Sequence, residues 1–151
     1  MSRYNKQAIT VLGAASIALQ TVANSFEVSP AYKTKLQQAH AQILVACRQW
    51  PGVGQVSEGA WMSSRLRTWT AQVKSDIRLG PWVMCTLTAV AIQAVTWLYE
   101  RPSSRLQRPL LDPLFPLLQE IFNTVEGGVE SSYESNKLAE KMLERLFELI
   151  E

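Results

Sequence analysis

Two long uncharged stretches limit the fold of this chain more than any other feature. Residues 7–26 run for twenty positions without Asp, Glu, Lys or Arg, and residues 81–99 run for nineteen. Helices of either length can cross the hydrocarbon core of a bilayer. Both stretches also contain Thr and Gln and little leucine, and polar amides are costly to place in lipid. We therefore interpret them as two central apolar helices, buried nearly all round inside a helical bundle.

The remainder of the chain has the spacing of helices rather than strands. Apolar residues recur at steps of three and four, and short segments with Pro or Gly separate the runs. Ser29 followed by Pro30 is typical of a helix start, and Gly80 followed by Pro81 is typical of a boundary between two helices. The pattern predicts an all-α, single-domain bundle of about six helices over residues 1–151.

The composition supports such a core without covalent cross-links. Of the 151 residues, 47% are hydrophobic, and a chain of this size buries about two-thirds of its surface on folding. Two cysteines are too few for a disulfide scaffold. The longest irregular pieces, residues 51–56 and 101–111, are short, which predicts antiparallel packing of neighbouring helices.

Charge is divided unequally along the chain, although the net charge is only +2. Residues 1–110 contain twelve Lys or Arg and four Asp or Glu. Residues 111–151 contain three Lys or Arg and nine Asp or Glu. Such a division shapes the surface potential and the partners that it attracts. Two interpretations remain open. The acidic end docks on the basic body, within one chain or between copies, or the basic body faces nucleic acid or anionic lipid. We favour docking.

The last helix, expected within residues 129–151, is the strongest candidate for a contact with a partner. It carries one apolar seam that neighbouring apolar residues widen, flanked by an acidic row and a basic row. A face this wide has to be covered. Two alternatives remain for what covers it. The helix projects or is exchanged between copies, because the segment follows Gly127 and Gly128, or it packs within its own chain. The seam consists of Leu138, Met142, Leu146 and Leu149.

A second, weaker candidate surface is basic and covers the region 65–108. Arginine beside aromatic residues occurs both in nucleic-acid interfaces and in protein contacts, and Trp61 and Trp69 share a predicted helix with several of these cations. Segment 101–109 adds three arginines framed by prolines, which predict an extended loop able to grip phosphates or carboxylates. An ordinary solvated surface is the alternative. The cations concerned are Arg65, Arg67, Lys74, Arg78, Arg101, Arg105 and Arg108.

Catalytic motifs are missing from the sequence. The single histidine, His40, falls on or beside an apolar helical face, which is typical of a residue at the rim of a core. Cys47 and Cys85 lack the spacing of zinc or redox ligands, and we expect both to be buried free thiols. No phosphate-binding loop or nucleophile elbow occurs. We therefore predict no catalysis, no cofactor and no metal site.

These features favour a non-enzymatic, structural helical protein of the assembly or adaptor class, which works through protein–protein contacts and forms homo-oligomers. We expect it in the cytoplasm or inside a virion, because polar residues break the first apolar run and no convincing signal-peptide cleavage site follows it. A nucleic-acid-binding module using the region 65–108 is the first alternative. A small two-span membrane protein is the second.

Overall fold

Every regular element in the computed structural model is a helix, over the residues that the structure describes: 3–25, 28–50, 56–77, 83–124 and 129–150. The all-α prediction is confirmed for these ranges. The seven α-helices slightly exceed the expected six because residues 101–124 form several short pieces. The elements are α1 (Arg3–Ser25), α2 (Pro30–Gln49), α3 (Val56–Ile77), α4 (Val83–Glu100), the 3₁₀ helix η1 (Pro102–Gln107), α5 (Arg108–Leu111), α6 (Leu114–Thr124) and α7 (Val129–Ile150).

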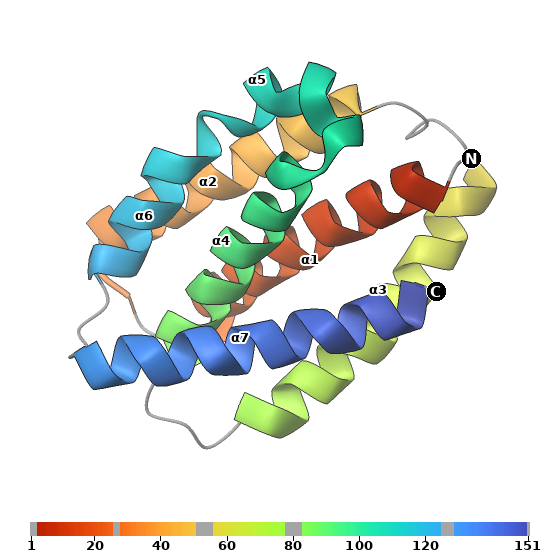
Figure 1. Ribbon diagram of the computed structural model, residues 1–151. Helices are drawn as coiled ribbons and strands as arrows, with labels where there is room; N and C mark the ends of the chain where they lie inside the picture. Colours follow the sequence, from red (N-terminus) through yellow and green to blue (C-terminus); the bar gives the residue numbers. More distant parts are fainter. Residues whose placement is uncertain (1–2, 26–27, 51–55, 78–82, 125–128, 151) are drawn as a thin grey trace.

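Helices α1 and α4 run through the middle of the arrangement and pack on each other (Figure 1). Helices α2 and α6 pack together on one side of this pair. Helices α3 and α7 pack together on another side, where α7 contacts both central helices. No helix among the described residues is long and apolar enough to cross a membrane.

The two central helices are formed by the two uncharged stretches of the sequence. In α4, residues 85–91 are all buried, so this part of the helix is covered all round. In α1, alanine occupies several of the buried positions, and small side chains let neighbouring helices approach closely. Buried hydroxyls inside these helices can bond to the preceding turn, as Thr10 does by donating to the carbonyl oxygen of Lys6 at 2.7 Å.

Helix α3 packs against α1 at Gly13. A Cβ atom at this position would lie 2.7 Å from Cδ1 of Leu66, which is closer than carbon atoms normally come. The end of the Leu66 side chain of α3 therefore occupies the space that a side chain at position 13 would need. Trp69 is fully buried one turn further along α3, and its indole Nε1 donates to the carbonyl oxygen of Met142 in α7 at 2.8 Å. The three helices are thus joined at this level.

The start of α2 agrees with its sequence signal. The Ser29 side chain accepts a hydrogen bond from the backbone N–H of Tyr32 at 3.2 Å, and Pro30 takes the first helical position. Gly80 and Pro81 lie outside the described residues, as does most of the predicted irregular piece 51–56.

The prediction of an extended loop in segment 101–109 is wrong. Only Arg101 has extended backbone, with φ −68° and ψ 132°, and the chain then turns directly into η1 and α5. Proline lacks an N–H and has φ preset near its helical value, so Pro102 and Pro109 fit the first turns of these two pieces. The backbone N–H of Ser104 donates to the carbonyl oxygen of Arg101 at 2.9 Å, which closes the first turn.

Candidate functional site

The apolar seam of the C-terminal helix faces the chain's own core. Met142 and Leu146 are fully buried, and Leu138 and Leu149 are half-buried against the same core. Helix α7 packs mainly on α4 and α3, so the seam is covered within one chain. Two further contacts hold it: Gln93 of α4 donates to the backbone carbonyl of Asn136 at 2.9 Å, and the rings of Trp97 and Phe147 lie 4.7 Å apart. A second copy can use this seam only by exchanging α7.

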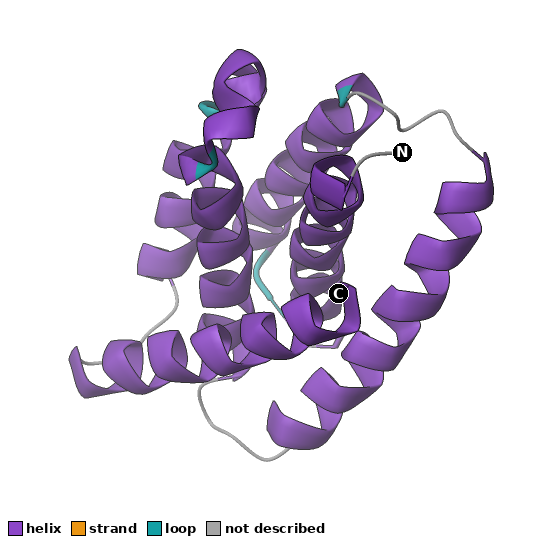
Figure 2. Ribbon diagram, turned by 45° about the vertical axis from the view of Figure 1, so that its right-hand side comes forward, coloured by secondary structure: helices purple, strands orange, loops and turns teal. Residues whose placement is uncertain are grey.

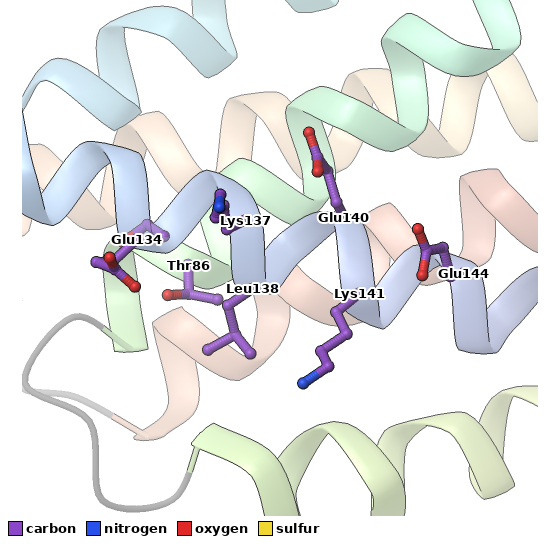
Figure 3. Close-up of a pocket in the computed structure, with 8 residues that line it drawn as sticks. Thr86, Glu134, Lys137, Leu138, Glu140, Lys141 and Glu144 are labelled. Atoms are coloured by element: carbon purple, nitrogen blue, oxygen red, sulfur yellow. The ribbon is translucent and has the colours of Figure 1, made fainter.

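The charged side chains of α7 lie on its outer surface. Lys137, Glu140, Lys141 and Glu144 are all exposed. Figure 3 shows Lys141 pointing toward α3, whereas Glu140 and Glu144 point to the opposite side of α7. Helix α7 is attached to the body through its apolar seam. An ion pair between Lys35 of α2 and Glu120 of α6, at 3.0 Å, joins the basic part of the sequence to the acidic part.

A shallow groove beside α7 is a site that the sequence analysis missed. It has a volume of about 510 Å³, within the range of small-molecule sites. The Oγ atom of Ser135 is buried without a hydrogen-bond partner, and Thr86 at the start of α4 is also buried. Hydroxyl residues on an otherwise apolar helical face are the only sequence signal of this groove. The lining residues are Thr86, Glu134, Ser135, Lys137, Leu138, Glu140, Lys141 and Glu144.

The charged side chains around this groove do not converge. Glu140 and Glu144 leave α7 on the side opposite to Lys141, and Glu134 lies toward the first turns of the helix (Figure 3). A binding pocket needs a few polar groups aimed at one point to orient a ligand. The groove therefore offers two buried hydroxyl residues, and the charges around it are not arranged to orient one small molecule.

The described basic residues of the region 65–108 are divided between two parts of the molecule. Helix α3 packs on α1 and α7, whereas η1 packs on α4 and α5 at a different end of the molecule (Figures 1 and 2). In α3, Arg65 is half-buried and Arg67 is exposed. The side chains of Trp61, Lys74 and Arg78 lie outside the described part of the chain.

Two of the three arginines in segment 101–109 serve the fold. Arg101 donates from Nε to the carbonyl oxygen of Trp97 at 3.1 Å, with its guanidinium 4.8 Å from the centre of the Trp97 ring. Arg108 repeats this arrangement on Tyr99, with a 2.9 Å hydrogen bond to the carbonyl oxygen and 5.3 Å to the ring centre. Both satisfy carbonyl groups at the end of α4, where orphan acceptors are expected. Arg105 is exposed.

The connector, defined as residues 101–113 between α4 and α6, presents an apolar side chain to solvent. Leu106 is 86% exposed, the highest value among the large hydrophobic residues described, ahead of Tyr133 at 56%. Its backbone is held in place, because Ser104 is fully buried two positions before it and Leu111 is fully buried after it. Exposed prolines surround Leu106 at positions 102, 109 and 113. The arginines of this segment were predicted from the sequence to form a candidate surface, whereas Leu106 was not.

His40 lies between α2 and α1 in a polar cluster. Its Nδ1 atom is 2.9 Å from Oγ of Ser16, and its Nε2 atom is 3.1 Å from the amide nitrogen of Gln20. Because an amide nitrogen only donates, Nε2 accepts, the ring proton sits on Nδ1, and that proton is donated to the serine oxygen. Partial burial lowers the pKa of His40 below its usual value, which favours this neutral form.

This cluster joins two helices rather than assembling a reactive serine. A protonated Nδ1 cannot take the proton of Ser16, and Ser16 lies in the middle of α1, where backbone N–H groups bond within the helix. Acyl transfer needs free donors beside the nucleophile for the developing oxyanion. Within the described residues, no group of three His, Cys, Asp or Glu side chains is placed to hold a metal ion.

The two cysteines are free thiols, as predicted. Cys85 is buried in α4, whereas Cys47 of α2 is only half-buried. Burial raises the pKa of the Cys47 thiol, with Arg48 acting in the opposite direction, so the thiol form is favoured at neutral pH.

Comparison of the chain with known protein families, with characterised proteins and with solved structures finds no match.

Proposed function

We propose that this protein acts through protein–protein contacts, as a non-enzymatic helical assembly or adaptor component that associates with copies of itself. The observation that carries the proposal is the display of Leu106 on the connector. Leu106 is 86% exposed, and covering a large apolar side chain of this kind with a partner makes the free energy of association more favourable. The surrounding turn is already ordered by the two arginine contacts on Trp97 and Tyr99, so binding costs little further entropy.

The charges of the molecule also support contact between copies. Helix α7 has exposed acidic side chains, and α2 contains Lys33, Lys35 and Arg48 without any acidic residue, with Lys35 paired to Glu120 of α6. Both helices contact α1, while α2 also packs on α6 and α7 also packs on α4. Complementary potentials of this kind steer association and fix orientation more than they add affinity.

We do not propose nucleic-acid binding. A nucleic-acid interface needs several cations along one face. Arg101 and Arg108 are engaged by the end of α4, and the exposed cations Arg67 and Arg105 belong to separate parts of the molecule. The expected location stays the cytoplasm or the interior of a virion, where two free thiols are stable.

The experiment that tests the proposal is sedimentation equilibrium of the full chain without detergent, at low and high salt. We expect the mass to rise with concentration above the 17.0 kDa of one chain. A mass of one chain at every concentration and both salts would contradict self-association. Removal of residues 129–151 is not a suitable test, because Met142 and Leu146 belong to the core and their loss would unfold the protein.

A further inference from the structure

Helix α3 lies at the edge of the helical arrangement and is attached along one narrow stripe (Figures 1 and 2). Its buried residues between positions 64 and 75 are Leu66, Trp69 and Val73, at steps of three and four. In the central helix α4, by contrast, residues 85–91 are all buried. Because apolar burial is the main attractive contribution to packing, α3 is held less firmly than α4. The exposed residues of the same part of α3 are Ser64, Arg67, Thr68, Ala71 and Ser75.

A buried polar atom beside this stripe opposes the packing of α3. The side-chain oxygen Oε1 of Gln72 is buried and accepts no hydrogen bond from the described residues. A buried carbonyl oxygen without a donor costs free energy, because it has lost its hydrogen bonds to water. This cost is recovered when α3 moves away and water reaches the oxygen, so Gln72 makes opening easier.

The helices beneath α3 have contacts of their own that do not involve it. Both α1 and α7 pack on α4, and they also contact each other. Between α4 and α7, Gln93 donates to the carbonyl oxygen of Asn136 at 2.9 Å, and the rings of Trp97 and Phe147 lie 4.7 Å apart. These contacts remain when α3 leaves, so the other helices can stay packed without it.

We propose that α3 opens as a separate unit, leaving α1 and α7 while the other helices stay packed, and so uncovers the surface around Gly13 and Met142. Leu66 lies against Gly13, and Trp69 donates to the carbonyl oxygen of Met142, so both positions become accessible in the open state. This inference goes beyond the proposed function and does not rest on it.

Hydrogen exchange can detect this opening. Isolated helices are marginally stable in water, so the 22 residues of α3 lose their helical hydrogen bonds once the helix is detached. Amide groups of a unit that opens by itself exchange at a lower free energy than amide groups that need global unfolding. We expect amides of residues 64–75 to be at least about 30-fold less protected than those of residues 85–98 in α4.

A substitution in α4 tests whether the two openings are separate. Leu98 is fully buried in α4, which packs mainly on α1 and α7. Leu98→Ala weakens the native state and the state with α3 open to the same extent, so α3 amides should exchange within about twofold of their original rate. The α4 amides should exchange at least about tenfold faster. Equal acceleration of α3 and α4 amides overturns the proposal.

The matched variant is Leu66→Ala, which shortens the side chain that lies against Gly13. We expect α3 amides to exchange about tenfold faster in this variant. Unchanged exchange of α3 would contradict the proposal.

A urea series on the unmodified chain gives a further measurement that does not depend on the folding of a variant. Partial opening exposes less surface than global unfolding, so exchange of α3 amides should increase less steeply with urea than exchange of α4 amides. Identical slopes and equal protection of the two helices would show that α3 opens only when the whole fold does, which refutes the inference.

Discussion

The C-terminal helix and the connector both carry apolar residues beside charged ones, but the structure uses them in opposite ways. In α7 the apolar seam is inside and the charges are outside. In the connector, two arginines hold the backbone, while Leu106 and the prolines face solvent. A strong amphipathic pattern predicts that one face of a helix is buried, but not whether the same chain or a partner covers that face. An apolar side chain that is available to a partner is identified only from the packed structure, as one that the rest of the chain leaves exposed.

The largest expected difference comes from one chemical change made in both regions. Leu146→Ala removes a fully buried side chain of α7 and should lower the free energy of unfolding by about 2–5 kcal/mol. Leu106→Ala removes an exposed side chain and should change it by less than about 0.5 kcal/mol. Urea denaturation at a concentration where the protein is monomeric measures both. Equal losses in the free energy of unfolding for the two variants would contradict the burial of Leu146 and the exposure of Leu106.

A smaller effect is expected where α3 meets α7. Trp69→Phe keeps an aromatic ring but removes the Nε1 donor to the Met142 carbonyl oxygen and part of the buried volume. We expect a loss of about 1–3 kcal/mol in the free energy of unfolding, from the same denaturation measurement. Trp97→Phe provides a comparison at a half-buried position on α4. An unchanged stability of the Trp69 variant would contradict the attachment of α7 through α3.

Within the connector, the arginines should differ from one another. Arg108→Ala removes the hydrogen bond to the Tyr99 carbonyl oxygen and the cation–π contact on its ring, which should cost about 1 kcal/mol of stability. Arg105→Ala, at an exposed position, should cost less than about 0.5 kcal/mol. Thermal unfolding of the two variants at low protein concentration compares them directly. The reverse order would show that the connector is not held by Arg108.

The smallest effect is expected away from both regions, at His40. Burial lowers its pKa in the folded chain, so the folded state binds this proton less readily than the unfolded state does. The resulting stability is fully present above the unfolded pKa of about 6.5 and decreases as the pH falls below it toward the folded pKa. His40→Asn should flatten the change in unfolding midpoint over this acidic window. A wild-type midpoint that rises on acidification there would contradict the sign.

Sequence reasoning predicted the helical class because the spacing of apolar residues is a local property. The buried stretches and the start of α2 at Ser29 follow from this spacing and from capping chemistry. The same reasoning failed for segment 101–109, because prolines are compatible with both extended backbone and the first turn of a helix. What decided the outcome there was the end of α4, whose carbonyl groups bind Arg101 and Arg108.

The candidate site was harder to predict than the fold. Ser16 and Gln20 are more than a dozen positions from His40, so their meeting depends on how α1 and α2 pack. The exposure of Leu106 could not be predicted from the sequence, because a single leucine between polar residues is compatible with a buried or an exposed position on a short helix. Its exposure follows from the fold of the connector, in which Ser104 and Leu111 are the buried residues.

The central position of α1 has a consequence for synthesis of the chain on the ribosome. Helix α1 is covered mainly by α4, which begins 58 positions after α1 ends at Ser25. At ordinary rates of translation, roughly 3–12 s pass before the first residue of α4 is made. During that interval α2 and α3 are the helices that can pack on α1. The apolar residues of α1 that α4 covers in the folded chain therefore stay accessible to chaperones for that time.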